Sequence, residues 1–444
     1  MSGARPTNES TLSRIAGETL LAGYRLFGRL VTPLLPLLHA RRMRRGKEDP
    51  ARRGERFGRA SLARPDGPLV WLHAASVGEM NAAQALIASL AETGVTVLLT
   101  TGTVTSARIA ASQRRPGVLH QFVPYDTPGN ISRFLDHWRP DLAITLESEI
   151  WPTTIHLLHA RGIPLVIASA TMSERTRAGW NKVPFVARRI FSRLTLCLAQ
   201  TQGDAERLAG FGVPRVEVSG NLKYDSQKLA ADPRALEDLR TALGSRPRWL
   251  AASTHEGEET IAASVHETLE ARGLADLVTI VVPRHPERGE IIANDLSARG
   301  LRVARRSAGE IPDAGTQIYL ADTIGELGLF YRLAPVAFIG KSLVPEGGQN
   351  PLEAARLSTA ILTGPHVFNL QDIYTPLIDA GGALVVEDEA RLTDQVERLL
   401  RDPDAARHVA VLAGDVTDAG SGALAATLDA LSSWLPIPAR QDGT

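Results

Sequence analysis

Residues 69–92, LVWLHAASVGEMNAAQALIASLAE, decide the fold of this chain. Positions 69–73 form an apolar run of strand length, small residues follow, and positions 80–92 have the Ala- and Leu-rich pattern of a helix. An apolar run without alternation is typical of a strand buried on both faces, as in a parallel sheet covered by helices. The stretch therefore predicts the first strand and helix of a doubly wound α/β domain.

The same alternation of apolar runs and helical patterns continues through both halves of the chain. Further strands are predicted at residues 95–100, 119–123, 142–146, 164–168, 194–199, 249–252, 277–282, 317–320, 336–339 and 359–362. We expect two Rossmann-like domains, at residues 61–222 and 223–435, after an N-terminal segment of residues 1–60. The last helices are candidates for packing back onto the first domain. Ligands of such sheets bind at the carboxyl ends of the strands, so two facing domains would place a ligand cleft between them.

The charge balance gives no sign of a nucleic-acid partner, because Lys plus Arg and Asp plus Glu both number 49. The single cysteine, Cys197, lies in the apolar run 194–199 and cannot form a disulfide within the chain. A buried thiol of this kind is typical of a protein in a reducing cytoplasm.

The N-terminal segment combines apolar and basic stretches. Residues 30–40 carry no charge but number only 11 and include two prolines, whereas a helix that crosses a bilayer needs about 20 apolar residues. Residues 41–59 then hold nine basic and three acidic side chains. This order predicts an element that lies on an anionic cytoplasmic membrane surface. The alternative is a helix packed on the first domain, followed by a solvated basic loop.

Two acidic motifs follow predicted strands in the first half. In HAASVGE, residues 73–79, Glu79 stands where a helix begins. A carboxylate there can take the proton of an attacking hydroxyl, which contributes about 10²–10⁴-fold to a rate, or it can simply cap the helix. In ESEIWP, residues 147–152, Glu147 and Glu149 would point the same way on an extended chain. They would orient an acceptor, hold a cation, or form an ordinary surface pair.

The second half carries residue types that bind anions. STHEGEE, residues 253–259, and PRHPER, residues 283–288, each follow a predicted strand and open a helix, where hydroxyls, amides and an Arg fork suit a phosphate. Salt-bridged turns are the alternative for the two arginines. The turns at residues 322–327 and 347–353 also run into helices, whose first amides hold a phosphate or are merely capped. Glu353 would accept hydrogen bonds from two ribose hydroxyls.

Signatures of a Walker loop and of a zinc site are missing. Residues 340–342 resemble the end of a Walker loop, but position 335 is Pro, so the phosphate cradle is lost. The sequence has no HExxH motif and no cysteine cluster for zinc. We therefore expect a metal-free reaction that needs no cofactor.

Together these motifs resemble the 3-deoxy-D-manno-oct-2-ulosonic acid (Kdo) transferases of lipopolysaccharide synthesis. The resemblance runs from the N-terminal apolar segment to about residue 420, with the motifs in the same order throughout. Its most specific parts are residues 73–79, 147–152, 220–225 (GNLKYD), 253–259, 283–288, 322–327, 350–353 and 364–366 (GPH). Such a series of separated matches is more specific than any one of them.

The resemblance implies a GT-B fold with an acceptor-binding first domain and a CMP-sugar-binding second domain. CMP-Kdo would be the donor substrate and a lipid A precursor the acceptor, with the enzyme peripheral or monotopic on the cytoplasmic face of the bacterial inner membrane. Glu79 would be the general base, and the acceptor side would hold Ser76, Glu147 and Glu149. The donor side would hold Lys223, Ser253, Thr254, His255, Arg284, His285, Gly325, Glu326, Asn350 and Glu353. The transfer would invert the anomeric configuration, and CMP would leave as a phosphate monoester.

Two positions depart from the family's pattern. Lys341 stands where the family often has Gly, and Gln349 where it often has His. Lys341 adds a positive charge near the expected donor pocket, and Gln349 cannot become cationic as His can. Both could alter donor handling or the number of sugars added.

Two other functions fit part of the pattern. A GT-B transferase or epimerase that uses a UDP-sugar would share the base and the phosphate turns. A two-domain protein that closes on a small anion without catalysis would share the turns alone. Only the full series of motifs favours CMP-Kdo.

Overall fold

The chain divides into two compact units. The computed structural model describes residues 11–112 and 115–436, with the backbone alone at residues 11–14 and 112. The N-terminal unit holds the chain up to Ser226 and again from Ser421, and the C-terminal unit is Gln227–Gly420. The chain thus leaves the N-terminal unit once and returns to it.

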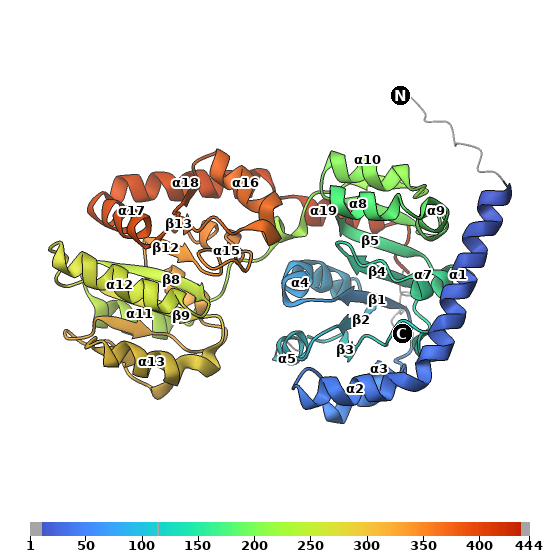
Figure 1. Ribbon diagram of the computed structural model, residues 1–444, viewed down its shortest axis with the longest axis horizontal. Helices are drawn as coiled ribbons and strands as arrows, with labels where there is room; N and C mark the ends of the chain where they lie inside the picture. The colour runs from blue at the N-terminus through green and yellow to red at the C-terminus, as the bar shows by residue number, and fades with distance from the viewer. Residues whose placement is uncertain (1–10, 113–114, 437–444) are drawn as a thin grey trace, which may run out of the picture. The chain divides into compact units, whose positions relative to one another are not determined.

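The N-terminal unit is built on a seven-stranded parallel sheet in the order β3-β2-β1-β4-β5-β6-β7 (Figure 1). Its strands are β1 (Leu69–Ala74), β2 (Thr96–Thr101), β3 (Val118–Phe122), β4 (Leu142–Leu146), β5 (Leu165–Ala170), β6 (Leu196–Ala199) and β7 (Val216–Val218). Every residue of β1 and of β4 is buried, which explains their continuous apolar sequences. The predicted doubly wound α/β fold is confirmed in this unit.

Helices cover both faces of this sheet. They are α4 (Val77–Glu92), α5 (Val104–Ser112), α6 (Pro128–Trp138), α7 (Pro152–Ala160), α8 (Glu174–Trp180), α9 (Pro184–Phe191), α10 (Gln202–Gly210), the 3-10 turn η3 (Leu222–Asp225) and α19 (Ala423–Leu431). On one face Met80 of α4 and Leu431 of α19 enter the core. On the other, Phe134 of α6 and Phe191 of α9 do so.

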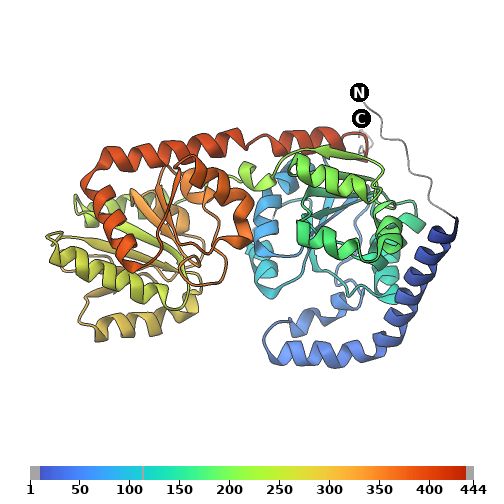
Figure 2. The same cartoon turned by 45° about the horizontal axis from the view of Figure 1, so that its top comes forward.

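The N-terminal segment is helical and packs on this unit. It consists of α1 (Thr11–Val31), η1 (Thr32–Leu34), α2 (Leu35–Arg44), η2 (Pro50–Arg52) and α3 (Arg53–Arg56). Figure 2 shows α1 and α2 meeting at a bend, where prolines stand in the first turns of η1 and α2. Leu21 is buried, and Glu18 pairs with Arg193 at 2.6 Å. No helix among the described residues is long and apolar enough to cross a bilayer.

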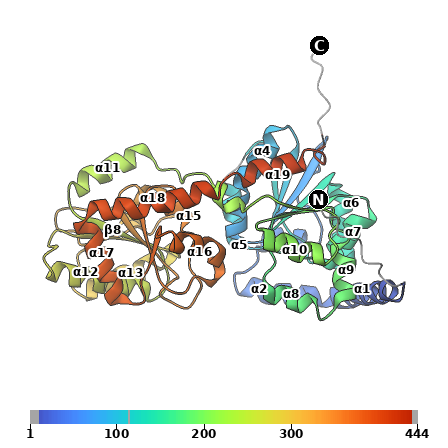
Figure 3. The same ribbon diagram turned by 90° about the horizontal axis from the view of Figure 1, so that it is seen from above.

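The C-terminal unit repeats the architecture, a sheet covered by helices (Figure 3). Its strands are parallel and lie in the order β10-β11-β9-β8-β12-β13-β14. Its strands are β8 (Arg248–Thr254), β9 (Val278–Pro283), β10 (Val303–Arg305), β11 (Ile318–Leu320), β12 (Val336–Ile339), β13 (Ala360–Thr363) and β14 (Ala383–Val385). Its helices and 3-10 turns are α11 (Pro233–Leu243), α12 (Glu258–Ala271), η4 (Pro286–Arg288), α13 (Gly289–Ala298), η5 (Arg306–Ala308), α14 (Leu327–Tyr331), α15 (Leu352–Ala355), η6 (Phe368–Leu370), α16 (Gln371–Asp379), α17 (Glu389–Arg401) and α18 (Pro403–Ala419).

Each sheet has a point where the strand order reverses. In the N-terminal unit the chain first builds outward from β1 to β3 and then starts again at β4 on the other side of β1. In the C-terminal unit the corresponding neighbours are β8 and β12. Ligands of open parallel sheets bind beyond the carboxyl ends of the strands at such a reversal. The two reversals therefore mark where functional side chains should be sought.

Candidate active site

Glu79 lies at the reversal point of the N-terminal unit, in the first turn of the helix that follows β1. Its carboxylate accepts hydrogen bonds from the Ala75 amide at 2.8 Å and from the Ser76 hydroxyl at 2.9 Å. The Ser76 hydroxyl in turn accepts from the Glu79 amide at 3.2 Å. This reciprocal arrangement resembles a capping box, with the acid on the amide of Ala75, the residue before the N-cap, so Glu79 does cap the start of α4.

The carboxyl group of Glu79 is also set for proton transfer. Burial raises its pKa to about 7, with further upward contributions from the charges of Glu147 and Glu149 and opposing hydrogen bonds from Ala75 and Ser76. Each of its oxygens accepts a single hydrogen bond from the described residues and keeps a lone pair. A carboxyl that titrates near neutral pH is suited to act as a general base, so capping and catalysis are compatible.

Glu147 and Glu149 follow β4 but bind different partners. Glu147 has a φ of +56°, in the left-handed region, so the extended chain on which the predicted common direction of the two side chains rested is not present. Its carboxylate pairs with Lys223 at 2.6 Å. Glu149 accepts a hydrogen bond from the Trp151 indole at 2.5 Å, and burial raises the pKa of Glu149. Both acids still contribute negative charge near Glu79.

Lys223 belongs to the N-terminal unit, on η3, and not to the unit that carries the other predicted donor residues. Its ammonium group is largely buried and is paired with Glu147. This pair limits the negative charge that surrounds Glu79. The role of Lys223 toward the donor stays a prediction.

At the reversal point of the C-terminal unit, part of the predicted anion site is already occupied by internal ion pairs. The Thr254 hydroxyl and the Arg288 guanidinium both donate to Glu259, at 3.1 and 2.9 Å. Arg288 therefore forms a salt bridge within the protein, which is the alternative that the sequence left open. Ser253 stands at the end of β8 with a φ of +55°.

Arg284 and Glu353 are available for a ligand. Arg284 is exposed at the end of β9, and no described residue accepts a hydrogen bond from its guanidinium. Glu353 is partly exposed on α15, and no described residue donates to its carboxylate. Burial raises the pKa of Glu353 to about 7, opposed by the charge of Arg284. A cation and a carboxyl that lie near each other and form no hydrogen bond to a described side chain suit a ligand with a phosphate and hydroxyl groups.

His255 links several predicted donor residues. Its Nδ1 lies 2.9 Å from a Glu346 carboxylate oxygen, its Nε2 lies 3.2 Å from Nε2 of Gln349, and its ring meets the His285 ring edge-on at 5.7 Å between centroids. Tyr374 donates to the Gln349 carbonyl at 2.7 Å. Gln349 is thus built into the same contact network as the two histidines.

The remaining predicted donor residues have structural partners. Glu326 accepts from Arg306 at 2.5 and 3.1 Å and from Thr323 at 2.5 Å, and these bonds, the one from Arg306 first, lower its pKa. Gly325 has a φ of +87°, which a residue with a Cβ rarely adopts. The Asn350 side chain accepts from the Leu352 amide, the first of α15, at 3.1 Å. Their roles toward a donor stay predictions.

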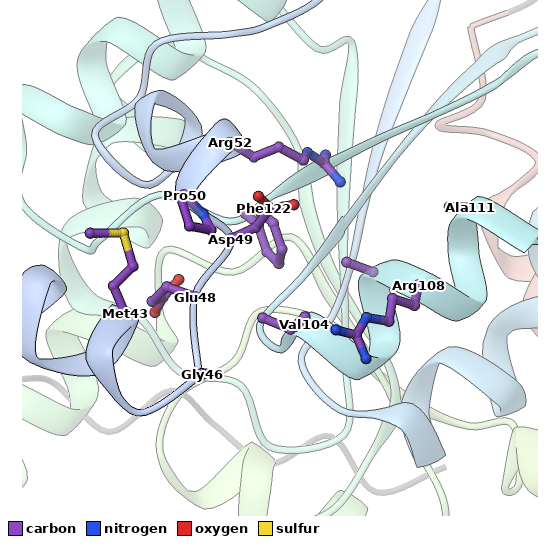
Figure 4. A pocket seen from close by; sticks show the side chains of 11 residues that line it. Met43, Gly46, Glu48, Asp49, Pro50, Arg52, Val104, Arg108, Ala111 and Phe122 are labelled. Carbon is purple, nitrogen blue, oxygen red and sulfur yellow. The ribbon is translucent and has the colours of Figure 1, made fainter. Parts of the chain in front are cut away.

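A separate pocket of about 610 Å³ opens in the N-terminal unit between the segment after α2 and α5 (Figure 4). It is lined by Met43, Gly46, Glu48, Asp49, Pro50, Arg52, Val104, Ala107, Arg108, Ala111 and Phe122. None of the predicted site residues is among them. Its two acids and two arginines balance, so the lining does not select the charge of a ligand.

Comparison with known proteins shows to which protein family the chain belongs. A family model described as 3-deoxy-D-manno-octulosonic-acid transferase (kdotransferase) matches residues 51–226. The 3-deoxy-D-manno-octulosonic acid transferase of Bordetella pertussis is 37% identical over 426 residues, which cover 93% of this chain and 99% of the relative. That of Haemophilus influenzae is 36% identical over 385 residues, 85% of this chain and 90% of the relative. The chain belongs to the Kdo transferase family.

The predicted family and enzyme class are thereby confirmed: this Kdo transferase is a glycosyltransferase. Among solved structures, the UDP-GlcNAc 2-epimerase of Neisseria meningitidis superposes with a TM-score of 0.56 at 13% identity, over 83% of this chain and 100% of that chain. A likeness at this identity shows the fold alone, and it agrees with the predicted GT-B class.

Sequence reasoning overlooked one residue of this Kdo transferase that the structure places at the reversal point. Glu258 is 1% exposed, and its carboxylate accepts four backbone hydrogen bonds from the turns after β8 and β12. The signal was present in the motif HEGEE, which has more acids at a helix start than a cap requires.

Proposed function

We propose that this Kdo transferase takes Kdo from CMP-Kdo and transfers it to a lipid A precursor with inversion at the anomeric carbon, with Glu79 as the general base. The observation that carries the proposal is the Glu79 carboxyl group, which lies at a strand reversal and has a pKa raised to about 7. A UDP-sugar as donor is the second candidate, and it is supported only by a likeness of fold.

The proposed reaction balances without a further reactant. The Glu79 carboxylate accepts the proton of the acceptor hydroxyl, and the hydroxyl oxygen forms a bond to the anomeric carbon of Kdo. The bond from that carbon to the phosphate oxygen of CMP breaks, and CMP leaves with the electron pair. Attack opposite the leaving group inverts the configuration. Arg284 would stabilise the charge on the leaving phosphate, because charge-assisted hydrogen bonds to a developing anion lower the barrier.

A test of this proposal compares donors and follows stereochemistry. The full-length protein should bind CMP more tightly than UMP or UDP in calorimetric titrations. Proton NMR of the transferred sugar should show an anomeric configuration opposite to that of the donor. Retention of configuration would remove the single-displacement mechanism, and preferential binding of UDP would favour the second candidate.

The rate of transfer should depend on pH through Glu79. A base must be deprotonated to work, so kcat should fall as pH drops below the Glu79 pKa of about 7 and level off above it. Well below pH 7, kcat should decrease about tenfold for each pH unit. The measurement is kcat at saturating substrates in buffers of constant ionic strength, with a circular dichroism check that the fold persists. A flat profile from pH 5 to 8 would contradict the assignment.

We further propose that the N-terminal helices lie on the cytoplasmic face of the inner membrane. Apolar side chains of α1, η1 and α2 are exposed, among them Leu30 at 68% and Leu37 at 70%. The basic stretch 41–59 follows them directly. Exposed apolar groups beside basic ones are typical of a segment that binds an anionic bilayer surface.

Replacing Leu30 and Leu37 together by Ser should weaken binding to vesicles that contain phosphatidylglycerol by at least about tenfold, because each buried Leu is worth about 1.5–3 kcal/mol. Vesicle co-sedimentation measures the effect. Val411→Ser, at a 58% exposed position on α18, is the matched control and should bind normally. Equal binding of the double variant and the control would contradict the membrane assignment.

A further inference from the structure

The buried carboxylate of Glu258 occupies a ring of backbone amides. Glu258 is the first residue of α12, and its Oε2 accepts from the amides of His255 at 2.9 Å and Lys341 at 2.6 Å. Its Oε1 accepts from the amides of Ser342 at 3.0 Å and Leu343 at 3.1 Å. One side chain therefore joins the turn after β8 to the turn after β12, across the reversal point of the sheet.

This arrangement is an anion site whose occupant belongs to the protein. A buried charge is costly unless it is well hydrogen-bonded, and four charge-assisted bonds meet that need. The amides of Lys341, Ser342 and Leu343 are consequently filled and cannot hold a phosphate from a ligand. These three amides bind the carboxylate of Glu258 instead.

The turn after β12 has an unusual backbone and packs tightly against this contact. Lys341 has a φ of +64°, a conformation that a non-glycine residue adopts only when its surroundings enforce it. A Cβ at Gly340 would lie 2.6 Å from the Ser253 carbonyl oxygen and 2.9 Å from Glu258 Oε2. The turns after β8 and β12 are thus packed closely together around the carboxylate.

The same turn leads to residues expected to meet the donor. Gln349 lies against His255, and Asn350 accepts from the first amide of the helix that carries Glu353. A shift of residues 341–343 would move the whole segment from 340 to 353 relative to Arg284 at the end of β9. Glu353 is thus linked to Glu258 through the chain that runs from residues 341–343 to α15.

We propose that Glu258 is a positioning residue of this Kdo transferase: its carboxylate is an internal anion that holds the 340–353 segment in the shape that binds the donor. The inference rests on the proposed donor function of the C-terminal unit. Glu258 acts through the loop and makes no contact with the reacting atoms.

The test uses Glu258→Ala in the full-length protein, which leaves the four amides around a small empty site. KM for CMP-Kdo should rise about 10–100-fold, as expected for the loss of hydrogen bonds to a charged group, while kcat changes less than about threefold. Formate should restore KM, because it can occupy the amide ring. Glu258→Gln should not respond to formate, because its side chain fills the site and its NH₂ group cannot accept. Glu267→Ala, on the same helix but outside the ring and paired with Arg299, is the matched control and should behave as wild type in every assay.

Hydrogen exchange gives a readout that does not depend on activity. The amides of residues 341–343 should exchange slowly in the wild type, rapidly in Glu258→Ala, and slowly again with formate. Unchanged exchange and KM would overturn the proposal. Fast exchange throughout the C-terminal unit would also overturn it, because Glu258 would then be a general stabiliser of the fold. If exchange changes locally as expected but the protein does not use CMP-Kdo, the contact between Glu258 and the loop is supported. The proposed donor is then rejected instead.

Discussion

Glu79→Gln is expected to lower kcat for Kdo transfer by about 10²–10⁴-fold, the contribution of a positioned general base. The affinity for CMP should stay within about twofold of wild type, because the substitution removes a proton acceptor and leaves the donor side unaltered. Gln also retains a carbonyl oxygen that can accept from the Ala75 amide or the Ser76 hydroxyl. The capping of α4 should therefore largely persist.

Three measurements on this variant separate catalysis from folding: kcat, the dissociation constant of CMP, and the midpoint of thermal unfolding. Glu92→Gln, at the exposed far end of the same helix, is the matched control. It should leave all three unchanged. Undiminished turnover of Glu79→Gln would contradict the proposed mechanism. A large drop in the unfolding midpoint would indicate that Glu79 acts mainly as a helix cap.

Arg284→Ala is expected to weaken CMP binding by about 10–100-fold, the usual worth of hydrogen bonds from a charged group. The guanidinium has no hydrogen-bond acceptor among the described residues, so its removal leaves no hydrogen-bond partner unsatisfied there and takes only a nearby charge from Glu353. The folding stability of the protein should for that reason be nearly unaffected. Calorimetric titration with CMP measures the first effect and urea denaturation the second.

Arg288→Ala should show the opposite pattern. Arg288 donates to the largely buried carboxylate of Glu259, so its loss leaves that acid without its cation and should lower the free energy of unfolding by about 1–3 kcal/mol. CMP binding should change less than in Arg284→Ala. Equal loss of CMP affinity in the two variants would contradict the assignment of Arg284 as the free donor-side cation.

The fold was predictable where strands are long and buried on both faces. The run at 69–73 and its counterparts carry a signal that needs no tertiary context. The strands β7, β10 and β14 were not predicted, because each has only three residues, lies at an edge of its sheet and is only partly buried, whereas the equally short but fully buried β11 was predicted. Such short stretches have too few residues for a periodic pattern, and their pairing depends on the sheet that they join.

Side-chain partners at the site were less predictable than the positions of the motifs. The sequence places Glu79, Glu147 and Arg284 after strands, where the structure has them. It could not show that Glu147 has a left-handed backbone, since that conformation is imposed by neighbouring elements. Nor could it show that Lys223 pairs with Glu147, because the two residues are distant in sequence and meet only in the folded unit.

The four amides that bind Glu258 could not be predicted from the sequence for a similar reason. Three of them belong to residues 341–343, more than 80 positions away. A main-chain donor carries no residue type, so no motif records it. Glu258 itself is part of the motif HEGEE, but an acid in the first turn of a helix most often stabilises only that helix.

The central claim is that this chain joins Kdo from CMP-Kdo to a lipid acceptor. Its most direct test is incubation of the full-length protein with CMP-Kdo and a lipid A precursor, with the mass of the lipid product and the released CMP measured together. We predict that the lipid gains the mass of one or more whole Kdo residues and that one CMP is released for each. An unaltered lipid mass, in a preparation that binds CMP and remains folded, would contradict the claim.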